Sequence, residues 1–424
     1  LGGTYAGAFG AVVSGQYGAF AYNEASITAQ ADAYDTGVAR ATALQVASAQ
    51  GNAAVHNYAS IVATSFGYEA QSSGVNLFAG DQAYLFNDSF IAAYAHADYY
   101  AFARGAMISG DYGAYTNNYD EIRAEAGSDG TAIAIGSVTN AEYGYANLYN
   151  GGGIYAEADG YDAIAYAAIV NGYYGADITN EGLIIATANG GGGFAYAVGL
   201  SASSDTGDIN VYNEGQIIAG AYDADGMAAI AVQMDSYGLN TVINNGLIAA
   251  YGDGARVAIS SGPYGIADIV NYGDIIGSIQ TGNYADSLYN DNYWLALQSS
   301  DFGDGDDVIV NSEDGLIVMP GSEIHLGGYD GGNAFYNYGM IVVLGDALID
   351  MGGNVAPFAL TLAPGDNPLP FYNGGVITML DGVPDDSLTI DGSFQGNGTL
   401  NVDLNLSTEA SDRLYITGDV IQPT

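Results

Sequence analysis

The stretch Asn180-Glu-Gly-Leu-Ile-Ile-Ala-Thr-Ala188 recurs with small changes as Asn213-Glu-Gly-Gln-Ile-Ile-Ala-Gly-Ala221 and as Asn244-Asn-Gly-Leu-Ile-Ala-Ala250. Its opening asparagine can be followed through thirteen copies, at intervals of 19 to 36 residues. One supersecondary unit per repeat is expected at such a period. The anchor asparagines are Asn23, Asn57, Asn87, Asn118, Asn150, Asn180, Asn213, Asn244, Asn271, Asn290, Asn311, Asn337 and Asn373.

Apolar residues keep fixed distances from these anchors. An isoleucine usually stands four residues after the asparagine, an alanine six residues after it, and another apolar residue two residues before it. These offsets share one parity, so the side chains point to one face of an extended chain. A period of two indicates strands and not helices.

Similar strands at intervals of about 30 residues can bury their apolar faces by coiling into a solenoid. We therefore predict an all-β parallel β-helix with three strands per turn and about 13 or more turns. The asparagines should stack at one corner, where their amides can form a hydrogen-bonded ladder. Asparagine tolerates a left-handed backbone at such a corner, and the glycine two residues later, as at Gly182 and Gly215, suits the same bend.

The repeat changes along the chain. Residues 1–270 form a long-repeat solenoid, and residues 271–424 are predicted to continue it with shorter repeats. Four prolines in the second part, Pro357, Pro364, Pro368 and Pro370, indicate an excursion loop. The first residues have no polar cap, so either the chain continues before Leu1 or that end stacks on another molecule.

The composition excludes several classes of partner. The chain has 48 acidic residues, five arginines and no lysine, for a formal net charge of −43. Nucleic acids, anionic membrane surfaces and acidic polysaccharides would be repelled. Cysteine is absent, so no disulfide framework exists, and no apolar run reaches the length of a transmembrane helix.

The 36 tyrosines are the most unusual feature of the composition. Several stand immediately before an anchor, as at Tyr149 and Tyr212, where the parity directs them outward. His56 occupies the same outward position and is predicted to be a surface residue. We expect the tyrosines to serve packing or lateral association along an outer face, with a carbohydrate groove as the alternative.

Candidate sites for chemistry are few. Gly303-Asp-Gly-Asp-Asp307 fits part of a calcium-binding nonapeptide repeat, which makes Asp304, Asp306 and Asp307 candidate calcium ligands; a solvated acidic turn is the competing interpretation. Asp306 with Asp307, or Asp385 with Asp386, would be an acid and base pair in a glycosidase. Adjacent carboxylates on a strand point to opposite faces, however, so we predict no catalytic residue and no required cofactor, with calcium as the one candidate.

The carboxyl-terminal part resembles a known family. Gly392-Ser-Phe-Gln-Gly-Asn-Gly-Thr-Leu-Asn-Val and Ser411-Asp-Arg-Leu-Tyr-Ile-Thr-Gly-Asp-Val420 are similar to the segment that precedes the outer-membrane barrel in bacterial autotransporter passengers. The anchor phrases resemble the β-helix repeats of the same family. This resemblance implies a right-handed parallel β-helix, transfer through the outer membrane, and adhesion or self-association. It transfers no catalytic residue.

Together these features predict a non-enzymatic structural or adhesive β-solenoid, extracellular or on a bacterial cell surface. We expect a homo-oligomer that assembles into fibres or a surface layer through solenoid ends or outer tyrosine faces, with a cell-surface or glycan ligand as a further partner. The alternatives are a glycan-binding or glycan-active β-helix protein and a calcium-dependent binding module.

Overall fold

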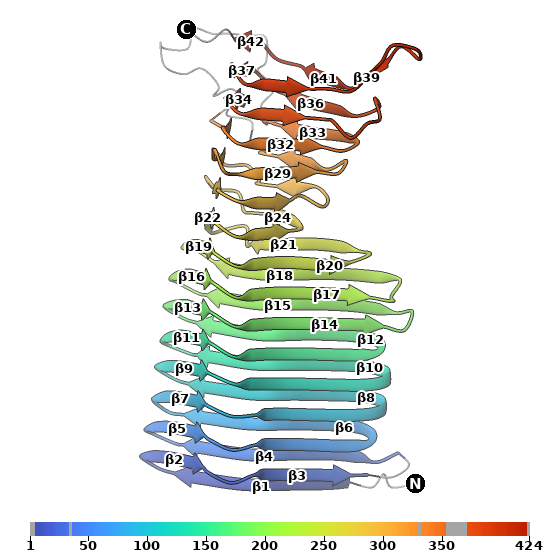
Figure 1. Cartoon of the computed structure of the whole chain (residues 1–424). Coiled ribbons are helices and arrows are strands. Elements are labelled where there is room, and N and C mark those ends of the chain that lie inside the picture. The colour runs from blue at the N-terminus through green and yellow to red at the C-terminus, as the bar shows by residue number, and fades with distance from the viewer. Residues whose placement is uncertain (1–4, 34–35, 329–331, 353–370, 422–424) are drawn as a thin grey trace. The chain divides into compact units, whose positions relative to one another are not determined.

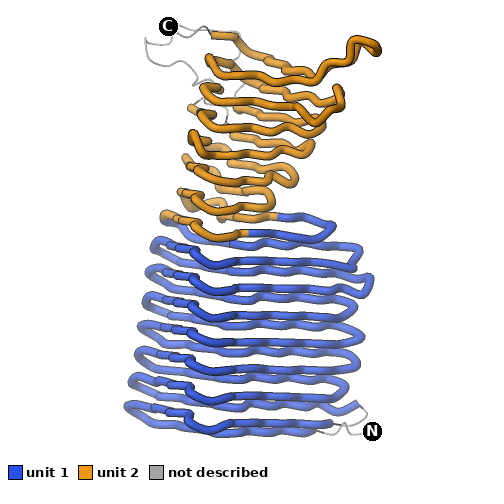
Figure 2. Tube along the Cα trace, viewed as in Figure 1, with its two compact units in different colours: residues 1–238, 249–256 blue, residues 239–248, 257–424 orange. Residues whose placement is uncertain are grey.

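Strands make up the regular structure throughout the described chain. The computed structural model describes residues 5–33, 36–328, 332–352 and 371–421, and these contain strands β1 to β42 and no helix. Two compact units divide the chain, residues 1–238 with 249–256 and residues 239–248 with 257–424 (Figure 2). Within each unit the strands stack as parallel coils (Figure 1), so the predicted all-β parallel solenoid is confirmed. The predicted proline-containing excursion loop lies at 353–370, outside the described residues.

Short strands that end on the anchor asparagines form one side of the first unit. Neighbouring strands pair in register, so that Asn118, Asn150 and Asn180 are direct partners. The identical phrase therefore places identical residues above one another. These strands are β2 (Gly18–Asn23), β5 (Asn52–Asn57), β7 (Gln82–Asn87), β9 (Gly113–Asn118), β11 (Tyr145–Asn150), β13 (Gly175–Asn180) and β16 (Asp208–Asn213).

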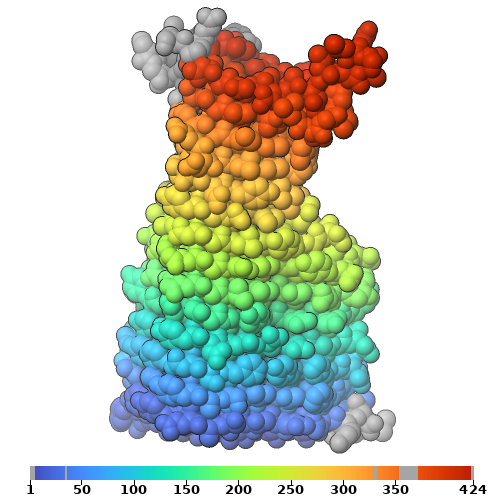
Figure 3. Space-filling view, viewed as in Figure 1, coloured from blue at the N-terminus to red at the C-terminus, as the bar shows by residue number. Residues whose placement is uncertain are grey.

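Most of the remaining strands of the first unit are longer, up to 21 residues in β10. On the face shown in Figure 3, the windings of this unit (blue to green) pack edge to edge into a continuous surface. These strands are β1 (Tyr5–Gly15), β3 (Ile27–Asp32), β4 (Val38–Ser48), β6 (Ile61–Ala79), β8 (Ile91–Gly110), β10 (Glu121–Ala141), β12 (Gly153–Gly172), β14 (Leu183–Gly190), β15 (Phe194–Ser204), β17 (Gln216–Tyr222) and β18 (Gly226–Ser236).

Three strands per turn is wrong for part of this unit. In β6, β8, β10 and β12 the two strands predicted after each anchor are joined into one, and a register shift between Ser128 and Thr131 is what remains of the expected corner in β10. A real corner forms where Gly191–Gly193 separates β14 from β15. In the joined strands, parallel pairing resumes directly after the register shift, so the chain bends there without ending the strand.

The second unit has three short strands per turn, as predicted. Its anchor strands are β19 (Leu239–Asn244), β22 (Ile266–Asn271), β25 (Ser287–Asn290), β28 (Val308–Asn311), β31 (Ala334–Asn337) and β34 (Phe371–Asn373), and β37 (Phe394–Gly396) and β42 (Val420–Ile421) continue the same sheet without an anchor asparagine. This side of the coil thus has seven described strands in the first unit and eight in the second, a number of windings that differs a little from the 13 counted on asparagines.

The other strands of the second unit form the remaining two sides of each coil. They are β23 (Asp274–Ile276), β24 (Ser278–Gln280), β26 (Tyr293–Leu295), β27 (Ser300–Asp301), β29 (Leu316–Met319), β30 (Glu323–His325), β32 (Met340–Val343), β33 (Asp346–Asp350), β35 (Val376–Thr378), β36 (Ser387–Asp391), β38 (Thr399–Asn401) and β41 (Arg413–Ile416). The hairpin of β39 (Leu404–Asn405) and β40 (Ala410–Ser411) is antiparallel. The strands β20 (Leu247–Gly252) and β21 (Ala255–Ser261) have residues in both units.

The core of each unit is built from the residues at fixed offsets. Ile91, Ile122 and Ile154, each four residues after an anchor, are fully buried, and each contributes about 1.5 to 3 kcal/mol of burial free energy. In the second unit Trp294 takes this place, fully buried, and its indole Nε1–H donates to the carbonyl oxygen of Gly277 at 3.1 Å. Parity thus decides which side chains are inside.

Glycine is required at the corner for a different reason from the predicted one. Neither the anchors nor the glycines two residues after them adopt positive φ in the described chain, so the expected left-handed corner is wrong. A Cβ at Gly182 would lie 1.9 Å from the carbonyl oxygen of Gly152, and one at Gly215 would lie 1.9 Å from that of Gly182. The windings approach so closely at this corner that only hydrogen fits.

Candidate functional site

The structure places the thirteen anchors in two hydrogen-bonded columns of buried side chains. In the first unit Asn118 Nδ2 donates to Asn150 Oδ1 at 2.8 Å, and Asn150 Nδ2 donates to Asn180 Oδ1 at 2.7 Å. The first column contains Asn23, Asn57, Asn87, Asn118, Asn150, Asn180 and Asn213. The second contains Asn244, Asn271, Asn290, Asn311, Asn337 and Asn373.

Most amides in these columns also bind the backbone. Asn150 Nδ2 lies 3.1 Å from the carbonyl oxygen of Leu183 and 3.3 Å from that of Gly152. A fully satisfied buried amide stabilises the corner and leaves no donor or acceptor for a ligand. The role of the columns is therefore to hold successive windings in register.

The three candidate calcium ligands do not converge on one point. Asp304 and Asp306 are exposed, whereas Asp307 is fully buried, so the interpretation of all three as a solvated turn is wrong for Asp307. Its side chain points into the coil because it stands four residues before Asn311, at the inward parity. Over the described ranges no group of three or more His, Cys, Asp or Glu side chains is placed to hold a metal ion.

Asp307 belongs to a second buried column, which the repeat analysis missed. Asp307 Oδ1 accepts from the backbone N–H of Asp286 at 2.8 Å, and Asn333 Oδ1 accepts from the backbone N–H of Asp307 at 2.7 Å. Asp286 Oδ1 in turn accepts from the N–H of Ala267 at 2.6 Å. Ala267, Asp286, Asp307 and Asn333 all stand four positions before an anchor. This shared offset could have predicted the column from the sequence.

Burial changes the acidity of this column. Desolvation raises the pKa of Asp307 to about 7, despite the hydrogen bond from the backbone of Asp286, and the carboxylates of Asp286, Asp306 and Asp301 raise it further. The second oxygen, Oδ2, has no hydrogen-bond partner among the described residues. Desolvation also raises the pKa of Asp286. At neutral pH, the column therefore contains a carboxyl group that is only partly ionised.

Aspartate side chains that accept backbone N–H groups also hold in place the segment that resembles autotransporter passengers. Asp386 Oδ1 accepts from the N–H of Gly345 at 2.6 Å, and its pKa is raised mainly by desolvation. Asp412 accepts from the N–H of Asp386 at 3.1 Å and from that of Asp403 at 2.6 Å. The aspartate of the Ser-Asp-Arg-Leu motif thus fastens the β39–β40 hairpin to the winding below it.

The proposed acid and base pairs lie just before strands β28 and β36. Asp306 and Asp385 are exposed, and their neighbours Asp307 and Asp386 are buried. An exposed and a buried carboxylate cannot flank one glycosidic bond, because both must reach the same substrate atom. These pairs therefore provide no glycosidase geometry.

A histidine of the second unit lies between two carboxylates. His325 Nε2 is 3.0 Å from a carboxylate oxygen of Glu323, and Nδ1 is 3.2 Å from one of Asp350. Partial burial lowers the pKa of this imidazole, but the two hydrogen bonds outweigh it, and the pKa is raised. Residue spacing does not predict this cluster, because Asp350 comes from the next winding.

Aromatic rings form columns on the outside of the first unit. His56 stacks between Tyr22 and Phe86, with ring centroids 4.9 and 4.6 Å apart. At the turn before the anchor strands, Tyr112, Tyr143, Tyr145 and Tyr174 are each at least half exposed. Tyr112 and Tyr143 lie 6.3 Å apart, and Tyr145 and Tyr174 lie 6.1 Å apart. We call these four residues the aromatic ridge.

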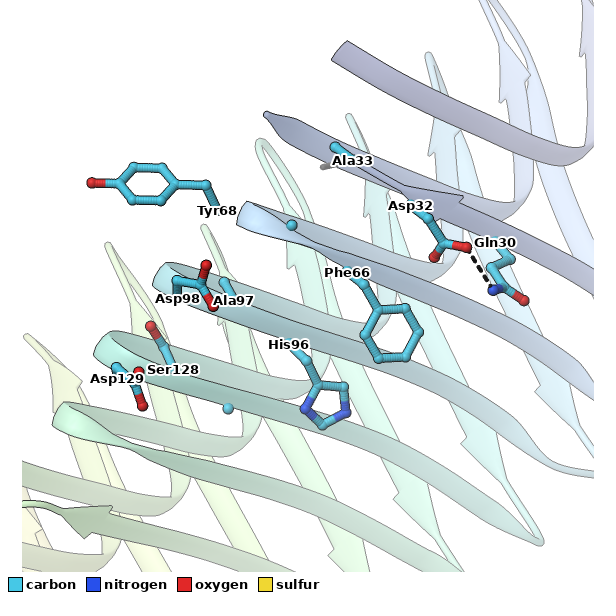
Figure 4. Close-up of a pocket in the computed structure, with 12 residues that line it drawn as sticks. Gln30, Asp32, Ala33, Phe66, Tyr68, His96, Ala97, Asp98, Ser128 and Asp129 are labelled. Carbon is cyan, nitrogen blue, oxygen red and sulfur yellow. Dashed lines mark hydrogen bonds between the residues drawn. The ribbon is translucent and has the colours of Figure 1, made fainter. Parts of the chain in front are cut away.

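A shallow hollow lies where the joined strands bend. Phe66 and His96 stack at 5.4 Å in its floor, and Asp98 and Asp129 stand together at one side (Figure 4). Asp32 lies beyond Phe66 in the same row. The hollow has a volume of about 680 Å³, which is in the range of small-molecule sites. The repeat pattern did not predict it.

Comparisons with models of known protein families, with curated proteins and with solved structures find no match for this chain. Among the residues that the structure describes, no helix combines the length and the apolar character needed to cross a bilayer.

Proposed function

We propose that this chain is a non-enzymatic, extracellular or cell-surface structural element that adheres or associates with copies of itself through the aromatic ridge. The observation that carries the proposal is the repetition of half-exposed tyrosines along one corner of a stiff scaffold. Tyr112, Tyr143 and Tyr174 have exposed fractions of 61%, 51% and 51%. Exposed aromatic patches of this kind mark interaction surfaces in soluble proteins.

The scaffold suits this role because its register cannot slip. Each winding is fixed by an asparagine column inside and by in-register pairing, so ridge residues remain at strand spacing. Tyrosine supplies contact area at a small cost in conformational entropy, and its hydroxyl can stay hydrated. A row of such rings presents the same contact repeatedly, which favours lateral association of like molecules.

The bacterial autotransporter passenger is the family that we propose for the chain. A β-solenoid is the fold that this resemblance requires, and Asp412 in the Ser-Asp-Arg-Leu motif has a structural task in the last windings. Secretion to the cell surface is part of the same proposal.

The net charge sets the conditions for association. A charge of −43 makes like molecules repel one another at low ionic strength, and salt screens that repulsion over about 10 Å at 0.1 M. Association through the ridge should therefore increase with salt or with added calcium.

The test is association of the purified chain, followed by light scattering and negative-stain images over a range of concentrations. Replacing Tyr112, Tyr143 and Tyr174 by threonine, which keeps strand propensity, should abolish association. The matched control replaces Tyr58, Tyr119 and Tyr161, which are exposed to a similar degree, and should leave association intact. Monomers at every concentration, with and without salt and calcium, would contradict self-association; equal loss in both variants would contradict the role of the ridge.

A further inference from the structure

The hollow of the first unit is built by one row of residues across four strands. Asp32 of β3 pairs with Phe66 of β6, Phe66 with His96 of β8, and His96 with Gly127 of β10. The row faces outward, since Asp32, Phe66 and His96 are all exposed. An acidic side chain, two stacked rings and a glycine therefore follow one another at strand spacing.

The glycine leaves the end of the aromatic stack open. Phe66 covers one face of the His96 ring, with an interplanar angle of 13°. A Cβ built on Gly127 would lie 3.2 Å from His96 Nδ1, so a side chain at this position would occupy the space next to the imidazole. The absence of one keeps a slot beside the ring, and Phe66 itself is 42% exposed.

Negative groups surround the rings. Asp32, Asp98 and Asp129 line the hollow and are exposed, and Figure 4 shows the last two on the same side of the floor. Gln30 Nε2 donates to Asp32 Oδ2 at 3.0 Å. Of the described residues that line the hollow, none is lysine or arginine, so no positive side chain in the lining neutralises the carboxylates.

We propose that this hollow binds a small soluble organic cation through an alkylammonium group. Aromatic faces attract such cations and tolerate their apolar surface, and the carboxylates contribute the opposite charge. A neutral sugar would stack on the rings but would gain no attraction between opposite charges from the three carboxylates, and an anion would be repelled. The site is separate from the aromatic ridge, so either proposal can fail alone.

Tetramethylammonium is the probe, titrated into the purified chain by calorimetry at about pH 8, where an ordinary imidazole is neutral. Ionic strength is held constant with sodium chloride, so that diffuse attraction to the acidic surface is the same throughout. Saturable binding with one site per chain is expected. Glucose, titrated in the same way, should not bind; binding of glucose without tetramethylammonium would overturn the proposal.

Matched variants separate the hollow from the general negative charge. Asp98→Asn with Asp129→Asn should weaken binding at least about fivefold, because two of the three carboxylates that attract the cation are removed. Asp88→Asn with Asp205→Asn removes the same charge from exposed positions elsewhere and should change the affinity less than about twofold. Equal weakening by the two pairs would show diffuse attraction and overturn the site.

Two further variants test the rings and the slot. Phe66→Ser should weaken binding about threefold through loss of the cation–π contact. Gly127→Val should remove binding by filling the space beside His96. Circular dichroism of each variant establishes that the strands remain, and unchanged affinity in both folded variants would overturn the proposal.

Discussion

Replacing Asp307 by asparagine tests the buried carboxyl column directly. In the folded chain Oδ1 of this residue accepts one backbone N–H, and the buried Oδ2 has no partner in the described structure. Asparagine has nearly the same shape and keeps the Oδ1 acceptor while removing the ionisable group. Asn333 already fills the equivalent position one winding further on. Asp307→Asn should therefore fold and stabilise the second unit at neutral and alkaline pH.

The sign and size of the effect follow from the pKa. Burial raises the pKa of Asp307 from 3.8 to about 7, so between these values the unfolded chain is ionised while the folded chain still holds the proton. The contribution of this carboxyl group to the free energy of unfolding is therefore fully present below about pH 4, and it is lost as the pH rises to about 7. At about 1.36 kcal/mol per pH unit, the loss has an upper bound of about 4 kcal/mol. Above pH 7 the variant should regain part of this free energy of unfolding. Near pH 4 it should show no advantage over the wild type.

Trp294 provides a local assay. It is the one tryptophan of the sequence and is fully buried in the second unit, so its fluorescence during denaturant unfolding reports on that unit alone. The free energy of unfolding is measured across the pH range for wild type and variant, and the difference between them is the quantity of interest. Taking the difference removes the general self-repulsion of an acidic chain, which also increases with pH.

Asp306→Asn is the matched control. It removes the same charge one residue away, but Asp306 is exposed, and a change of about 0.5 kcal/mol or less is expected. The reasoning is refuted if both variants shift stability equally, or if the advantage of Asp307→Asn is the same near pH 4 as near pH 8.

Two other predictions concern single contacts. Asn150→Ala should cost about 2 to 4 kcal/mol, because two hydrogen bonds of the column are lost and their buried partners are left unpaired; thermal melting by circular dichroism would show this, and Asn147→Ala, on the outward side of the same strand, should cost far less. The His325 imidazole should titrate above its ordinary value, and Asp350→Asn should lower its pKa in an NMR titration. Since that pKa is raised, the ion pair stabilises the fold below about pH 6.5 and loses this effect as the pH rises through the folded value; a titration unchanged in Asp350→Asn would show that the contact is not made.

The sequence predicts the inside of each winding well because parity is a local property of the strand. Once the anchor is fixed, Ile122 and Ala124 must point inward whatever the rest of the chain does, and both are buried. The number of strands per turn was less predictable. Whether a chain bends with or without a break depends on small changes at the corner, such as glycines at 191–193, and periodicity does not register these.

The hollow and the His325 cluster were unpredictable for another reason. Phe66 and His96 share one offset, nine residues after Asn57 and Asn87, but the same offset holds an aspartate at Asp32 and a glycine at Gly127, so no residue type repeats there. The two rings pair directly, just before the register shift at Gly67 and Glu69. Pairing across windings decides such contacts, and it can be known only after each strand has been aligned with its neighbours.

The position four residues before each anchor faces inward in both units, but it holds apolar residues in the first unit and mostly polar ones in the second. In the first unit this position holds alanine at every anchor but one, as at Ala83 and Ala114, both fully buried. In the second unit Asp286, Asp307 and Asn333 each place there a side-chain oxygen that accepts the backbone N–H from the neighbouring winding. Both residue types supply that oxygen, so the hydrogen bond does not distinguish them.

What separates the two residues is the second polar atom. Asn333 Nδ2 donates to the carbonyl oxygens of Gly327 and Met351, at 2.6 and 2.8 Å, whereas Oδ2 of Asp307 has no donor within the described ranges. An amide has no proton that titrates in this pH range, whereas the carboxyl group of Asp307 is only partly ionised near pH 7. The choice between asparagine and aspartate at this position therefore sets whether a winding responds to pH, while the backbone stays the same.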